Sequence, residues 1–186
     1  MSDRGPVLLA LARAAIAEAL GGPPVRRPDG AAWLDVPGAC FVTLKQDGHL
    51  RGCIGNILPA GSLYAVVTHN ARSAALSDPR FAPLQPDELA RTRLEISLLS
   101  ALEPIAADSE SAVLAALRPG VDGLLLTAPG RSAVFIPSVW DQLSAPREFL
   151  QHRRDKGRFP RDRWLPGTRA QRFTAEHFEE AEAPPS

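Results

Sequence analysis

The sequence is poor in cysteine, in net charge and in long apolar runs. Its 2 cysteines, Cys40 and Cys53, are too few for a disulfide framework, and no CxxC or paired His/Cys spacing indicates structural zinc. The 21 basic and 21 acidic residues cancel, which excludes a whole-protein field that would attract nucleic acid or an anionic membrane. The most apolar early stretch, residues 7–20, contains Arg13 and Glu18 and therefore cannot span a bilayer.

Several familiar catalytic signatures are also missing. The sequence contains no P-loop, no dinucleotide-binding GxGxxG, no HExxH and no GxSxG, so it gives no support for the activities that depend on them. The 4 histidines are scattered and predict no metal site. The start of the chain lacks the pattern of a signal peptide. We therefore expect a cytoplasmic protein with reduced thiols and with no metal or cofactor of its own.

What remains is an ordinary globular composition. Apolar residues make up 45% of the chain and charged residues 23%, as in folded domains. A chain of 186 residues suits one domain or two closely packed lobes. Helical spacing, alternation and turn residues predict the elements. The expected helices cover 6–20, 63–76 after an N-cap at Ser62, 86–90, 109–117, 137–143 and 146–152, and the expected strands cover 40–45, 49–54, 94–99, 123–127, 132–136 and 169–174.

Helices and antiparallel pairs alternate along the chain without the regular spacing of βαβ units. The sequence therefore predicts an α+β fold, with a mostly antiparallel sheet and flanking helices. Residues 21–30 are rich in proline and glycine and are expected to form a linker or surface loop. After the last expected strand, the chain is expected to end in an acidic tail.

One hairpin has the strongest local signal. Asp47-Gly48 accepts the positive φ angles of a type I′ turn between strands 40–45 and 49–54. The turn then predicts three facing pairs, which are Gln46 with His49, Leu44 with Arg51, and Val42 with Cys53. The three residues of the second strand would share one face, with Cys40 diagonal to Cys53 at about 7 Å. That separation is too long for a disulfide unless a bulge intervenes.

The segment Leu50-Arg51-Gly52-Cys53-Ile54-Gly55-Asn56 is the most informative. Two glycines inside a strand mark a bulge or a close backbone approach, and such a site can expose Cys53. Arg51 on the same strand face would favour the thiolate, and His49 or His69 is a candidate base. The alternative is that Cys53 is a small buried apolar residue, which is common for a free cysteine.

Polar residues that interrupt apolar patterns are further candidates. Asn70 lies on the buried stripe of helix 63–76, where it either points into a polar cleft or bonds a neighbouring backbone group. Asp78 and Arg80 flank a proline and suit an anion contact, a helix stop or an internal ion pair, of which the pair is favoured. Glu95 alternates with apolar neighbours, so it faces either solvent or a groove.

Residues 147–172 form a basic stretch. Interleaved aromatic residues permit base stacking, but no nucleic-acid-binding motif accompanies them. A solvated basic face is therefore the favoured interpretation, and nucleic-acid binding the lesser one. The basic residues of the stretch are Arg147, Arg153, Arg154, Lys156, Arg158, Arg161, Arg163, Arg169 and Arg172.

Six blocks stand in a distinctive order along the chain. They are Leu50-Arg-Gly-Cys-Ile-Gly55, Asn70-Ala71, Asp78-Pro-Arg-Phe81, Glu95-Ile-Ser97, Gly120-Val-Asp-Gly123 and Pro137-Ser-Val-Trp-Asp-Gln-Leu143. Together they resemble the AMMECR domain family, the A component of AmmeMemoRadiSam systems. The hexapeptide with the central cysteine is the family's signature. One departure is the Lys-Gly-Arg-Phe of residues 156–159, where members often read Lys-Ala-Gly.

The resemblance implies a single AMMECR-type domain over residues 5–180 with a tail at 181–186. It implies a larger and a smaller lobe with a groove between them near the signature, and a homodimer in some members. It also implies partners, because similar proteins are encoded with a Memo-like protein, related to extradiol-type dioxygenases, and with a radical SAM enzyme.

Two functions of different classes follow. In the first, the groove near Cys53 binds a small molecule or a partner's modified peptide, with Cys53 as nucleophile or acceptor and His69 as a second catalytic candidate. In the second, the groove docks a Memo-like or radical SAM protein without chemistry. Nucleic-acid binding through 147–172 is a third. The expected binding residues are Arg51, Gly52, Gly55, Asn70, Asp78, Arg80 and Glu95.

Overall fold

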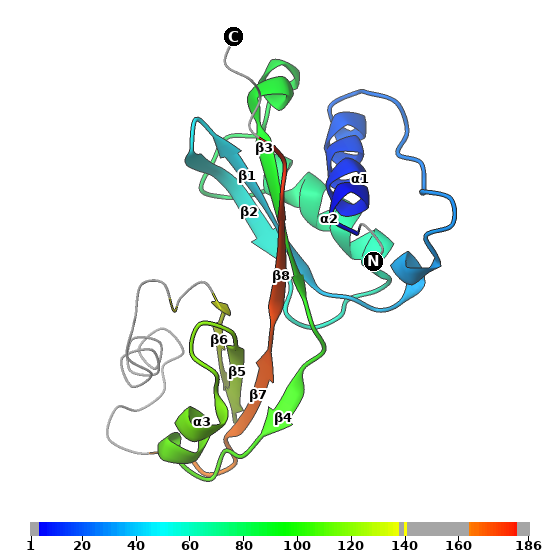
Figure 1. Ribbon diagram of the computed structural model, residues 1–186. Helices are drawn as coiled ribbons and strands as arrows, with labels where there is room; N and C mark the ends of the chain where they lie inside the picture. The colour runs from blue at the N-terminus through cyan, green and yellow to red at the C-terminus, as the bar shows by residue number, and fades with distance from the viewer. Residues whose placement is uncertain (1–3, 138–139, 141–163, 182–186) are drawn as a thin grey trace. The chain divides into compact units, whose positions relative to one another are not determined.

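The computed structural model describes residues 4–137, 140 and 164–181. The chain divides into two compact units, the first formed by residues 1–99 and 176–186 and the second by residues 100–175. Each unit contains its own four-stranded sheet and its own hydrophobic cluster (Figure 1). The predicted α+β class with antiparallel pairing is confirmed.

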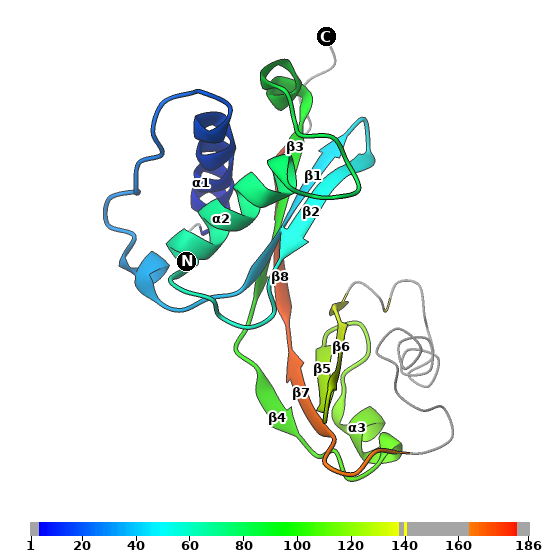
Figure 2. The same ribbon diagram turned by 180° about the vertical axis from the view of Figure 1, so that it is seen from behind.

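The first unit is a sheet with two helices on one face. The strands are arranged in the order β2-β1-β3-β8, and both views of the chain show α1 and α2 on the same side of them (Figures 1 and 2). Two short 3₁₀ helices complete the unit. Its elements are α1 (Arg4–Ala19), η1 (Ala32–Asp35), β1 (Cys40–Gln46), β2 (His49–Gly55), α2 (Leu63–Leu76), η2 (Pro86–Arg91), β3 (Arg93–Leu99) and β8 (Ala175–Glu179).

Alternation along the central strands decides which sheet face is buried. Val42 and Leu44 of β1 and Leu94 and Ile96 of β3 are fully buried, because they point to the face that α1 and α2 cover. Residues between them, such as Thr43, point to the opposite face. The helices close the core with Leu8, Leu11, Ile16, Val66, Val67, Ala71 and Ala74.

The second unit is a smaller sheet with one short helix. Its strands follow the order β4-β7-β5-β6, and β5 and β6 form the predicted second hairpin, with Gly130 in its turn at a φ of 70°. Val113, Leu126 and Phe135 lie in its core. The elements are β4 (Glu103–Ile105), α3 (Glu110–Ala116), β5 (Gly123–Ala128), β6 (Arg131–Phe135) and β7 (Arg169–Phe173).

Two strands were not predicted from the sequence. The three residues of β4 are too few to show alternation, and the acidic residues around β8 favour a tail over a strand. The expected helices at 137–143 and 146–152 and most of the basic stretch lie outside the described residues. No helix in the described part of the chain is long and apolar enough to cross a membrane.

The hairpin between β1 and β2 has the predicted turn but a different register. Asp47 and Gly48 both adopt positive φ, at 50° and 76°, and Gln46 faces His49 as expected. The pairing then shifts at a bulge, which leaves Arg51 as the extra residue of β2. Beyond it the facing pairs are Leu44 with Gly52, Thr43 with Cys53, and Val42 with Ile54.

The bulge corrects the predicted faces of the hairpin. Because one extra residue reverses the alternation beyond it, the expected pairs Leu44–Arg51 and Val42–Cys53 are wrong. Cys53 lies with Thr43 on the face away from the helices, whereas Cys40 points into the core. The two cysteines are thus on opposite faces and both are free.

Candidate functional site

The two glycines of the signature hexapeptide allow close backbone contacts. A Cβ added to Gly52 would lie 2.2 Å from the carbonyl oxygen of Ala74 in α2. A Cβ added to Gly55 would lie 2.2 Å from the ring of Phe41 and 2.6 Å from the carbonyl oxygen of Cys40. The close approaches expected of these glycines are therefore present, and they fix β2 against α2 and β1.

Cys53, between these glycines, is held by three side chains. Its thiol is half-buried and accepts a hydrogen bond from the Thr43 hydroxyl, with Oγ1 and Sγ 3.2 Å apart. Its backbone N–H donates to Asp78 Oδ2 at 2.9 Å, and its carbonyl oxygen accepts from Arg80 Nη2 at 3.2 Å. We call Asp78 and Arg80 the Cys53 clamp.

The clamp is an internal ion pair, as the sequence favoured. Asp78 has a side chain only 2% exposed, and it accepts from Arg80 Nη2 at 2.7 Å and Nε at 2.9 Å. These bonds to Arg80, with a smaller contribution from the backbone N–H of Cys53, hold the pKa of Asp78 well below its usual range. Asp78 therefore stays charged and binds the edge of β2.

Arg51 is also committed to an internal partner. Its Nη2 and Nε donate to the two carboxylate oxygens of Glu88 at 3.1 and 3.3 Å, and both side chains are 15% exposed. Its Nη1 donates to the carbonyl oxygen of Ala82 at 2.9 Å. Arg51 thus ties β2 to the segment before β3, and its guanidinium has little capacity left for an anionic ligand.

Glu88 makes the stability of the first unit depend on pH. The hydrogen bond from Arg51, followed by the backbone N–H of Gln85, lowers the pKa of Glu88 from 4.5 to about 2. A carboxyl group whose pKa is lower in the folded protein than in the unfolded chain stabilises the fold at any pH above its unfolded-state pKa. This stabilisation is lost as the pH falls from the unfolded-state pKa to the folded-state pKa.

We expect the free energy of unfolding to decrease as the pH falls from about 5 to about 2. The Glu88→Gln variant should lose about 2 kcal/mol less over this interval than the unmodified chain. Denaturant unfolding at a series of pH values measures the difference. Parallel profiles for the two proteins would contradict the assignment.

Asn70 is buried and bonds a backbone group, one of its two predicted roles. It is 4% exposed, and its Nδ2 donates to the carbonyl oxygen of Cys40 at 3.0 Å and to Asn56 Oδ1 at 2.8 Å. The same nitrogen lies 3.6 Å from Cys40 Sγ. Burial raises the pKa of the Cys40 thiol to about 11, so Cys40 is an inert packing residue.

In the described part of the chain, neither candidate base makes a hydrogen bond to Cys53. His69 is exposed on α2 and lines a hollow of about 530 Å³, and in the described part of the chain it makes no hydrogen bond to the thiol. His49 is exposed next to the hairpin turn. The hollow is lined by Ile54, Gly55, Asn56, Ala60, Ala65, Val66, His69 and Asn70.

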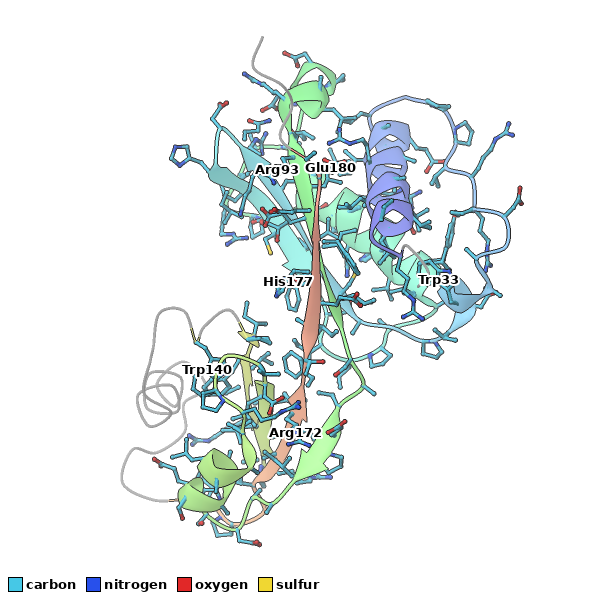
Figure 3. The ribbon with its side chains drawn as sticks, in the orientation of Figure 1. Trp33, Arg93, Trp140, Arg172, His177 and Glu180 are labelled. Atoms are coloured by element: carbon cyan, nitrogen blue, oxygen red, sulfur yellow. The ribbon has the colours of Figure 1, made fainter. Side chains whose placement is uncertain are left out.

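Glu95 lies on the same sheet face as Cys53. Thr43 is the cross-strand partner of both residues, so the three form a row across β2, β1 and β3. Lys45 Nζ lies 2.6 Å from a Glu95 oxygen. In the neighbouring row, Ser97 Oγ lies 2.9 Å from Nδ1 of His177, which Figure 3 labels on β8. The helix-free face is therefore polar.

Sequence reasoning missed three residues of this site. Thr43 carried a signal, because it alternates with buried residues in an expected strand. Glu88 and His177 carried none, since their contacts join segments far apart in the chain. No group of three or more His, Cys, Asp or Glu residues suited to a metal ion occurs among the described residues. In the second unit, Arg172 of the basic stretch (Figure 3) donates to Glu103 at 3.0 Å.

Comparisons with known proteins agree on one family. The AMMECR1 family model matches residues 9–178. A protein of Methanothermobacter thermautotrophicus is 37% identical, over 96% of this chain and 95% of its own, and a protein of Thermococcus kodakarensis is 36% identical, over 95% and 90%. The crystal structure of an uncharacterized protein of Pyrococcus horikoshii is similar with a TM-score of 0.81 and 33% identity, covering 95% of this chain and 91% of that one.

Proposed function

Because the chain belongs to the AMMECR1 family, we propose that it is the A component of an AmmeMemoRadiSam-type system. In this role it acts with a Memo-like protein and a radical SAM enzyme. It holds a small molecule or a modified peptide for them at the surface around Cys53. The ligand is bound without a covalent bond, and the thiol of Cys53 is one of its contacts.

The contacts that Thr43 and the Cys53 clamp make with Cys53 support a binding surface at this position. Side chains from β1 and from the segment after α2 fix both the thiol and the backbone of Cys53. A half-buried thiol held in one position can contact a ligand with little loss of conformational entropy.

The contacts of Cys53 favour recognition over nucleophilic catalysis. A nucleophilic cysteine needs a base within hydrogen-bond reach, and the Thr43 hydroxyl instead donates to the thiol. The Asp78 carboxylate is already engaged by Arg80 and by the Cys53 backbone. The same observations favour the second candidate function, a module that docks its partners without holding a ligand.

The two functions differ in what a purified complex contains. We would co-express the chain with the Memo-like protein and the radical SAM enzyme of the same genome and analyse the complex by native mass spectrometry. The proposal expects a complex with an additional noncovalent mass. Cys53→Ser should keep this mass, whereas Cys53→Trp should remove it by filling the surface. Ala10→Trp, at an exposed position of α1, is the matched control.

Other outcomes select other functions. A complex without additional mass indicates the docking module. An additional mass that stays on the denatured chain and is absent from Cys53→Ser indicates that the thiol reacts. The absence of any complex contradicts the proposed system. Melting curves of each variant show whether a loss reflects misfolding.

A further inference from the structure

We propose that the end of an extended peptide binds at the open edge of β2. Its main chain pairs with Gly55, and one small apolar side chain enters the hollow beside α2. This inference rests on the proposed function only for the class of ligand, a peptide, and it concerns contacts that do not involve the Cys53 thiol.

The direction of the Gly55 backbone follows from its neighbours. β2 is an edge strand with β1 on one side. The Asn56 N–H donates toward β1, to Cys40, whereas the N–H and the carbonyl of Cys53 bond the clamp instead. Backbone groups alternate in direction along an antiparallel strand. Gly55, two residues after Cys53, therefore also directs its N–H and carbonyl away from β1.

These two backbone groups of Gly55 have no partner among the described residues. The clamp covers the edge at Cys53, and Ala74 of α2 approaches Gly52 closely. In the part of the chain that the structure describes, no side chain bonds the outward-facing backbone groups of Gly55, and its close contacts, with Phe41 and Cys40, are on the side of β1. An unpaired donor and acceptor on a strand edge are the template that another extended chain recognises.

The hollow beside Gly55 provides side-chain contacts as well. Its apolar wall consists of Ile54, Ala60, Ala65 and Val66, which favours an apolar side chain. Asn70 also lines it, and its amide oxygen accepts no hydrogen bond from any described residue. A buried acceptor without a donor is unfavourable, so a donor on the ligand would be stabilised there.

The edge accommodates the end of a peptide and not a long strand. The next outward-facing position toward the hairpin turn, at Cys53, is occupied by Asp78 and Arg80. In the other direction β2 ends at Gly55. One residue is thus available for main-chain pairing, and a chain that ran on along β2 would collide with the clamp.

The test uses the tripeptide Ala-Val-Ala and amide NMR of the full-length protein labelled with nitrogen-15. Because only a pair of backbone bonds and a small side chain are involved, we expect weak binding, at about 10 mM or tighter. The Gly55 amide signal should move and saturate. The same tripeptide with every amide nitrogen methylated has no amide N–H group to donate to the Gly55 carbonyl. It should bind at least about tenfold more weakly.

Two matched variants locate the contact. Ala65→Leu extends into the hollow from an exposed position of α2 and should weaken binding at least about tenfold. Ala10→Leu makes the same change on α1, outside the hollow, and should leave binding unchanged. The tripeptide test uses this chain without the partner proteins, so its result does not depend on what the co-expressed complex contains, which separates this inference from the proposed function.

The remaining outcomes would overturn the inference. They are a Gly55 signal that does not move up to about 10 mM, equal binding of the methylated tripeptide, or unchanged binding by Ala65→Leu. The tripeptide acetylated at its N-terminus and the tripeptide amidated at its C-terminus identify the end that is bound. The cap on the bound end should abolish binding. Normal binding of a tripeptide capped at both ends would contradict a site for a chain end.

Discussion

Replacing Gly52 by alanine is expected to cost at least about 3 kcal/mol of unfolding free energy. The new Cβ would lie 2.2 Å from the carbonyl oxygen of Ala74. That oxygen belongs to the backbone of α2 and cannot rotate away, so the helix or the strand must shift. The shift would also displace Cys53, the next residue. Denaturant unfolding of the variant measures the loss.

Gly48→Ala is the control in the same hairpin. Gly48 has a φ of 76° and no atom within 4 Å of an added Cβ, so alanine there incurs only backbone strain of about 1 kcal/mol. A loss in Gly52→Ala no larger than in Gly48→Ala would show that the contact between β2 and α2 is not as close as described.

Replacing Asp78 by alanine is expected to cost about 3 kcal/mol. The change removes a charged acceptor with a side chain 2% exposed and leaves the backbone N–H groups of Cys53 and Arg80 without their partner. Asp78→Asn keeps the shape without the charge and should lose less. Unfolding at neutral pH measures the loss, and hydrogen exchange at the Cys53 amide should become faster.

Asp35→Ala is the matched control for this carboxylate. Asp35 has a side chain 61% exposed and pairs with Arg27 at the surface. An exposed pair contributes little to stability because water screens the two charges. Similar losses in Asp35→Ala and Asp78→Ala, or an unchanged exchange rate at Cys53, would contradict the role of the clamp.

Local signals allowed much of the first unit to be predicted. Asp47-Gly48 predicts the turn because few other residue pairs accept two positive φ angles, and Ser62 predicts the start of α2, where its hydroxyl caps the helix. The ion pair of Asp78 and Arg80 was predictable for the same reason, since the residues are close in sequence.

The rest depends on contacts that sequence spacing does not encode. The bulge at Arg51 reverses the face on which Cys53 lies, and it accompanies an ion pair with Glu88, 37 residues away. Arg51 was expected to be a binding residue, and the spacing of the sequence could not reveal this distant partner. Strand β8 escaped prediction because its buried contact is made by Phe178 among polar and charged neighbours, which does not show clear alternation.

We propose that the thiol of Cys53 is held in an accessible position on a binding surface. The most direct test is the alkylation of the folded protein by iodoacetamide, with Cys53 and Cys40 resolved by mass spectrometry. Cys40 is buried and its pKa is raised to about 11, so it serves as the internal reference. We expect iodoacetamide to label Cys53 at least about tenfold faster than Cys40. Protection of both thiols until the protein unfolds would contradict it.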